Sequence, residues 1–162
     1  MVDYRERLEK AVALINEGLR AQQDQELDRA IELYRDSIEL CPTAEGHTYL
    51  GWALSYQGKF DEAIEHCHQA IAIDPDFGNP YNDIGVYLMQ RNQPEQAIAW
   101  LEKAKLASRY EPRQYPYINL GHIYTERGEL FKAIGEFEGA LKQAPEDERI
   151  RRHLDELKSR LN

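Results

Sequence analysis

A glycine recurs at a nearly constant interval along this chain, at Gly18, Gly51, Gly85 and Gly121. The three intervals are 33, 34 and 36 residues. Three more columns keep the same register, and their members are Ala30, Ala63, Ala97 and Ala133; Tyr34, Cys67, Leu101 and Phe137; and Ser37, Ala70, Ala104 and Ala140. A period of about 20–50 residues is typical of chains that stack copies of one small unit. The register therefore predicts four copies of a single structural unit.

The copy at residues 44–77 indicates what that unit is. Its first half carries Leu50-Gly51, and its second half carries small residues three, four and seven positions apart, at Ala63, Cys67 and Ala70. This spacing places them on one face of a helix, where another helix can approach closely. Gln-Gly-Lys at 57–59 separates the two halves, and Pro75 closes the copy. We predict two amphipathic helices joined by a tight turn at 57–59.

The pattern resembles the tetratricopeptide repeat, a helix–turn–helix unit of about 34 residues. The resemblance implies an all-α fold, a right-handed superhelical solenoid of antiparallel helix pairs. We expect a single domain over residues 1–162, with repeats at about 4–43, 44–77, 78–113 and 114–145 and a capping helix at 146–161. Ile150, Leu154, Leu157 and Leu161 form the apolar stripe expected to bury that cap against the last repeat.

The third repeat departs from the pattern in two places. Asn92 holds the turn position that Gly58 and Gly128 hold elsewhere, and Asn tolerates a left-handed backbone better than most residues. Arg109 occupies the position of the closing Pro, and two extra residues precede the next repeat. We expect either a longer second helix or a wider loop at 108–114.

In this family the first helix of each repeat lines a concave groove, which implies a set of peptide-binding residues. The candidates are Tyr49, Trp52, Tyr56, Asn82, Asp83, Val86, Met89, Ile118, Asn119 and His122. Exposed aromatic rings are frequent anchors at interfaces. The alternative for Trp52 is packing against a neighbouring repeat. The alternative for Asn82 and Asn119 is a hydrogen bond between helices.

A well-known ligand of such repeats is the acidic C-terminal tail of heat-shock chaperones, which a clamp of two Lys, two Asn and an Arg holds. The matching positions hold Ile15, Leu19, Tyr49, Asn79 and Asp83 in one frame, and Thr48, Trp52, Asp83, Tyr115 and Asn119 in the other. Neither frame supplies the cations, and Asp83 would repel a carboxylate. A chaperone tail is therefore not the expected ligand.

The sequence favours no chemistry beyond binding. His66, Cys67 and His68 are consecutive, and consecutive helical side chains point about 100° apart, so they cannot converge on one metal ion. We expect Cys67 to be buried and both histidines to lie at the surface. No nucleophile elbow, phosphate-binding glycine loop or HExxH motif is present. We expect no enzyme activity, no cofactor and no metal.

Charge and composition narrow the class of partner. The net charge is −9, and residues 1–100 hold 8 Lys and Arg against 18 Asp and Glu. This acidity argues against a nucleic-acid partner. No apolar run reaches the roughly 18–20 residues of a membrane span, and no secretion signal is evident. Cys41 and Cys67 are expected to be reduced thiols, so we expect a cytoplasmic protein.

We therefore interpret the chain as a scaffold or adaptor that binds a neutral, apolar or basic protein segment in its groove, as a monomer or weak homodimer. Two alternatives stay open. The 36-residue interval between Gly85 and Gly121 is similar to the widened repeat of pilotins, which assist the assembly of type IV pili and secretins. The other alternative is a structural protein that associates with itself.

Overall fold

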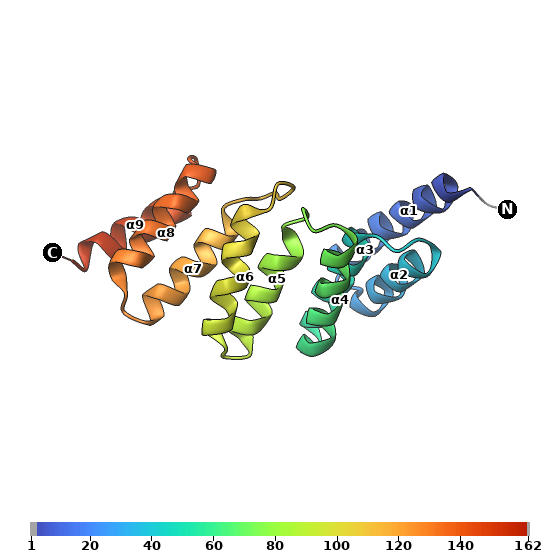
Figure 1. Ribbon diagram of the computed structural model, residues 1–162, viewed down its shortest axis with the longest axis horizontal. Helices are drawn as coiled ribbons and strands as arrows, with labels where there is room; N and C mark the ends of the chain where they lie inside the picture. Colours follow the sequence, from blue (N-terminus) through green and yellow to red (C-terminus); the bar gives the residue numbers. More distant parts are fainter. Residues whose placement is uncertain (1–2, 162) are drawn as a thin grey trace.

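The structure is a computed structural model that describes residues 3–161. Residues 1, 2 and 162 of the expected domain lie outside the described residues. The described part consists of nine α-helices without a strand: α1 (Tyr4–Gln23), α2 (Leu27–Leu40), α3 (Ala44–Tyr56), α4 (Phe60–Ile73), α5 (Asn79–Gln90), α6 (Pro94–Leu106), α7 (Tyr115–Glu126), α8 (Leu130–Gln143) and α9 (Glu148–Ser159). The two ends of the chain lie at opposite ends of an elongated array (Figure 1). The all-α expectation is confirmed.

The helices pack as successive pairs. The closest packing is within α1–α2, α3–α4, α5–α6 and α7–α8, and each pair contacts the next through α2–α3, α4–α5 and α6–α7. The first helices α1, α3, α5 and α7 also contact one another in that order. This arrangement is a solenoid, in which one row of first helices forms a continuous face. Within residues 3–161, no helix has both the length and the apolar composition needed to cross a bilayer.

The repeating columns are the contacts that hold each pair together. The first alanine column, Ala30, Ala63, Ala97 and Ala133, is fully buried. The repeated glycine lies under the large residue of its own pair: a Cβ built on Gly18 would lie 2.5 Å from the Tyr34 ring, and one on Gly121 would lie 2.5 Å from the Phe137 ring. The glycine interval in the sequence thus records the place where a second-helix side chain fills the space above a first helix.

A left-handed residue ends the first helix of every pair. The positive φ angles belong to Gln25, Gly58, Asn92 and Gly128, the last three as predicted. The next residue donates its backbone N–H to the carbonyl five positions back, as Lys59 does to Leu54 at 3.2 Å. The sequence analysis did not predict a left-handed residue at Gln25, because glutamine has no preference for this backbone conformation. Only its position in the repeat, equivalent to that of Gly58, indicates the turn.

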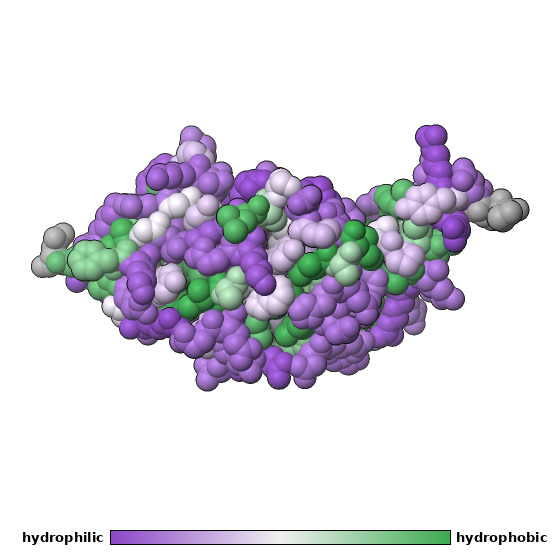
Figure 2. All heavy atoms as spheres, viewed as in Figure 1, coloured by the Kyte–Doolittle hydropathy of each residue, from purple (hydrophilic) through white to green (hydrophobic). Residues whose placement is uncertain are grey.

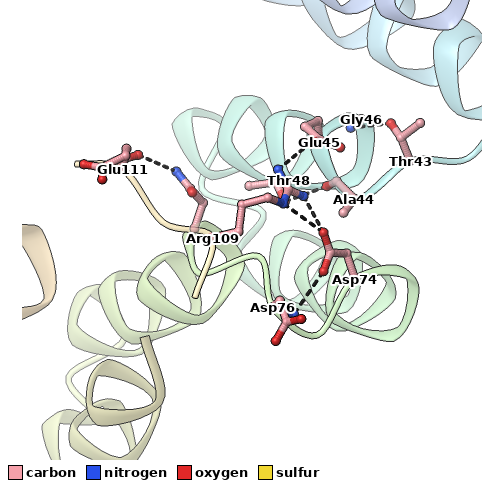
Figure 3. A network of polar contacts seen from close by, with 10 residues as sticks. Thr43, Ala44, Glu45, Gly46, Thr48, Asp74, Asp76, Arg109 and Glu111 are labelled. Atoms are coloured by element: carbon pink, nitrogen blue, oxygen red, sulfur yellow. Dashed lines mark hydrogen bonds and ion pairs between the residues drawn. The ribbon is translucent and has the colours of Figure 1, made fainter. Parts of the chain in front are cut away.

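The two extra residues of the third repeat form a wider loop rather than a longer helix. Backbone hydrogen bonds tie this loop to the α4–α5 connection: Gly78 donates to the Arg109 carbonyl at 2.9 Å, and Arg109 donates to the Asp76 carbonyl at 3.0 Å. The Arg109 guanidinium donates to Asp74 Oδ2 at 3.0 Å and to Glu45 Oε1 at 2.8 Å (Figure 3). The loop at 107–114 is therefore held against the second and third repeats.

The last helix, α9, covers the end of the array. Asp147 caps its N-terminus by accepting hydrogen bonds from the backbone N–H groups of Arg149 and Ile150. Ile150, Leu154 and Leu157 are buried, as the stripe predicted. The prediction was wrong for Leu161, which is 42% exposed because α9 ends at Ser159.

Candidate functional site

A hollow of about 870 Å³ lies between α3, α5, α7 and the loop at 107–114, on the face formed by the first helices. Figure 2 shows hydrophobic patches in the middle of a mostly hydrophilic face of the molecule. Sixteen residues line the hollow: Thr48, Tyr49, Trp52, Ser55, Tyr56, Phe60, Asn79, Asn82, Asp83, Val86, Tyr87, Gln90, Tyr110, Pro112, Tyr115 and Asn119. Seven of these side chains are aromatic and one is charged, so the hollow combines apolar walls with a single carboxylate.

The structure brings together seven of the ten predicted site residues. They are Tyr49, Trp52, Tyr56, Asn82, Asp83, Val86 and Asn119. The other three do not line the hollow. Met89 packs against the main core, and Ile118 packs against the separate core beside α9. His122 is exposed, with its ring edge-on to the rings of Phe137 and His153.

Sequence reasoning missed the wall contributed by the loop at 107–114. Tyr110 is 4% exposed and lies against Gly78, where an added Cβ would be 2.5 Å from Tyr110 Cβ. Tyr115, at the start of α7, is 46% exposed and borders the same hollow. The signal in the sequence was the insertion itself, which carries Tyr110 and Pro112 to the wall of the hollow.

Trp52 is the aromatic residue of α3 that, with Tyr56, lines two hollows. It is 38% exposed, and its ring centroid lies 5.7 Å from that of Tyr56, which is 63% exposed. Both rings also border a second hollow of about 500 Å³ near the ends of α1 and α2, together with Leu19 and Leu27. Trp52 therefore stands between two hollows. Tyr49 is more enclosed, since its ring stacks on Tyr34 with centroids 6.0 Å apart.

The two asparagines of the groove bind each other. Asn119 Nδ2 donates to Asn82 Oδ1 at 2.9 Å, and Asn82 is only 8% exposed. The alternative interpretation, a hydrogen bond between helices, therefore describes this pair. The bond holds α7 against α5 across the floor of the hollow, and it leaves the Asn119 carboxamide oxygen as an acceptor beside the cavity.

Asp83 is half-buried beside this pair. Burial raises the pKa of its carboxyl from the ordinary 3.8 to about 7, against the lowering effect of a hydrogen bond from Asn82. None of the salt bridges in the described part of the chain involves Asp83. The groove thus contains a carboxylate without a counter-ion from its own chain.

The consecutive His66, Cys67 and His68 point in different directions, as expected. Cys67 is fully buried and His68 is exposed, but the expectation of a surface position was wrong for His66. His66 is half-buried, with its Nδ1 atom 3.0 Å from Nδ1 of the buried His47. Burial lowers the pKa of His47 to about 4 and also lowers the pKa of His66, so one neutral ring donates to the other. Across residues 3–161, no three metal-ligating side chains converge.

Comparison with known proteins places this architecture in a family. Residues 44–77 match the family model described as the tetratricopeptide repeat. The chain is 34% identical over 99 residues to the small glutamine-rich tetratricopeptide repeat-containing protein 2 of Mycosarcoma maydis, a match covering 60% of this chain and 28% of that protein. It is 26% identical over 139 residues to the mitochondrial import receptor subunit TOM70 of Rattus norvegicus, covering 84% of this chain and 22% of that protein. The chain spans less than a third of the length of these relatives.

Solved structures share the fold over nearly the whole chain. The PilF protein of Pseudomonas aeruginosa superimposes with a TM-score of 0.86 at 23% identity, covering 95% of this chain and 70% of that one. PilW, described as a type IV pilus biogenesis factor, gives 0.80 at 20% identity, with 92% and 69% covered. YrrB, described as having an unusual peptide-binding site, gives 0.64 at 22% identity, with 86% and 72% covered. At these identities the likeness concerns the fold alone.

Proposed function

We propose that this chain, which is a tetratricopeptide repeat protein, is a non-enzymatic scaffold or adaptor that holds a partner segment in the hollow between α3, α5 and α7. Proteins of this family bind protein or peptide partners. The observation that carries the proposal is the hollow of about 870 Å³ with seven aromatic side chains in its walls. Exposed Trp and Tyr rings do not contribute to solubility. They bury large apolar areas at little cost in side-chain entropy when a partner covers them.

The lining defines the kind of segment. It contains no Lys, Arg or His, so an acidic chaperone tail would find no cation there. A neutral, apolar or basic segment fits the aromatic walls, and a single linear segment bound in this way has a free energy of about −8 kcal/mol, or micromolar affinity. The proposal also includes a cytoplasmic location and a partner that is a protein rather than a nucleic acid. It further includes a monomeric or weakly dimeric state.

Replacement of Trp52 by alanine tests the proposal. Peptides are first selected on the wild-type protein from a random library displayed on phage, and their affinities are then measured by isothermal titration calorimetry. Because Trp52 is a central aromatic anchor, we expect Trp52→Ala to weaken binding by at least about 2 kcal/mol, roughly 30-fold.

The chain offers a matched control in its second tryptophan. Trp100 lies on α6, against His68 and Tyr81, and borders neither hollow. Trp100→Ala should leave peptide affinity within about twofold in a variant whose circular dichroism is unchanged. Unchanged affinity in a folded Trp52→Ala variant, or failure to select any peptide, would overturn the groove assignment.

A second candidate is a pilotin-like role in the assembly of type IV pili or secretins. It is favoured by the likeness to PilF and PilW over more than nine-tenths of this chain. Binding of the purified protein to a secretin segment, measured by the same calorimetry, would support this role over that of a general adaptor. Self-association is the third candidate, and a mass that rises with concentration in sedimentation equilibrium would support it.

A further inference from the structure

Asp83 is an unusual residue for the centre of a protein–protein groove. It is the only charged side chain among the sixteen that line the hollow. The two arginines of the loop at 107–114 are engaged elsewhere, Arg109 by Asp74 and Glu45 and Arg113 by the Ser108 carbonyl and Glu111. A half-buried carboxylate without a cation is destabilising, because burial removes hydration that no partner replaces. Such uncompensated groups are concentrated at functional sites.

The surroundings of Asp83 favour a positive charge. Burial raises the pKa of Tyr87 and Tyr110, and the negative charge of Asp83 is the next cause for both. The same charge contributes to the raised pKa of Tyr49, after burial and Glu45. Three phenol rings from α3, α5 and the loop at 107–114 therefore lie within the field of this carboxylate. Aromatic faces carry partial negative charge and attract cations, as a carboxylate does.

Tyr87 lies one turn after Asp83 on α5, at the wall of the same hollow. Tyr87 is 3% exposed and its hydroxyl is buried, so an incoming side chain can meet only the ring. Asp83 is therefore the charged acceptor that the hollow offers to a cation.

We propose that the segment held in the groove inserts a lysine or arginine side chain between the tyrosines and pairs it with Asp83. This inference rests on the proposed function and names the residue chemistry that the groove selects. The cation binds the carboxylate, while Tyr49 and Tyr110 cover its alkyl stem. The remainder of the segment lies against Trp52 and Tyr56.

The unpaired carboxylate lowers the stability of the folded chain, and this loss can be measured independently of peptide binding. The pKa of Asp83 is about 7 in the folded chain and has its ordinary value, 3.8, when unfolded. A raised carboxyl pKa means that the folded state binds the proton more tightly, so stability contributed by this group falls as the pH rises from about 4 to 7. Asp83→Asn removes that loss. The variant should therefore show a higher thermal midpoint than wild type at about pH 8.

The experiment measures Asp83→Asn against peptides that differ by one charge. Peptides selected from the random library are synthesised with each Lys or Arg in turn replaced by norleucine or citrulline. At the position that pairs with Asp83, we expect the replacement to weaken the affinity for the wild-type protein about tenfold. Asp83→Asn should weaken the affinity for the parent peptide by the same factor. It should weaken the affinity for the replaced peptide by less than about twofold. Asp36→Asn, an exposed acid on α2, is the control and should change neither affinity.

The pH profile adds a second arm. Asp83 must be ionised to pair with the cation, so affinity for the parent peptide should rise between about pH 6 and pH 8 in wild type and stay constant in Asp83→Asn. Since no other acid, base or histidine lines the hollow, the slope is assigned to Asp83.

The outcomes separate this inference from the proposed function. Selected peptides without a shared Lys or Arg, or equal effects of Asp83→Asn on charged and uncharged peptides, would overturn the cation site while peptide binding stands. Failure of the library to yield any binder would instead overturn the proposed function. Were Asp83→Asn to fail to fold, the replaced peptides measured on wild type would still decide, since equal affinity for parent and norleucine peptides contradicts the inference.

Discussion

Phe137→Ala is expected to destabilise the protein by about 3–5 kcal/mol, the largest effect of any single substitution that we predict. Phe137 lies on α8 and is 2% exposed. Its ring fills the space above Gly121 and lies 4.5 Å from the His153 ring, centroid to centroid. Truncation leaves a cavity where α7, α8 and α9 meet. Because Gly121 on one side of this cavity has no side chain, it cannot help to fill it.

Phe131 provides a matched control on the same helix. It is 80% exposed, so Phe131→Ala should change stability by less than about 0.5 kcal/mol. Urea denaturation followed by circular dichroism measures both variants. Similar losses in the two would mean that the packing of the fourth repeat onto α9 is not what stabilises this end of the array.

Gly51→Ala is expected to cost about 1–3 kcal/mol although it adds only one methyl group. A Cβ at Gly51 would lie 2.9 Å from the carbonyl oxygen of Ala63, a backbone atom of the facing helix. At Gly85 and Gly121 the nearest atoms belong to side chains, which can rotate away. At Gly51 only a separation of α3 from α4 relieves the clash. Because α3 carries Trp52, peptide affinity should fall as well.

Gly135→Ala is the control for the change in helix propensity. Gly135 is exposed within α8, and an added Cβ meets no atom within 4 Å. Alanine loses less backbone entropy than glycine on forming a helix, so this variant should be more stable by about 0.5–1 kcal/mol. Opposite signs for the two substitutions in the same denaturation experiment are the expected result. A stabilising Gly51→Ala would contradict the close approach of α3 and α4.

The periodic residues allowed most of the fold to be predicted. The closest approach of two helices recurs at one place in each pair, and that place tolerates only a small side chain, so the glycine and alanine columns report it directly. The turn at Asn92 was predictable because left-handed backbone favours few residues. The turn at Gln25 was not, since the same left-handed backbone falls there on a residue type that does not favour it.

The candidate site was predictable only as far as it follows the repeat. Tyr49, Trp52, Tyr56 and Val86 lie where the family register puts groove residues. His122 departs from it because α9 follows α7 and α8, and its ring turns toward His153. The pairing of Asn82 with Asn119 was left open by the sequence, which places both on first helices but does not specify their distance.

The sequence by itself determined the all-α class and the four helix pairs, because these follow from local periodicity. The face that carries the aromatic residues followed from the resemblance to the repeat family. The tertiary structure decided what encloses that face. Arg109 reaches Glu45, 64 positions earlier in the chain, and this contact holds the loop that brings Tyr110 to the groove. It also decided that Asp83 has no counter-ion, because no cationic side chain of the described residues forms an ion pair with it. Long-range contacts of this kind depend on how the repeats stack, which no local pattern encodes.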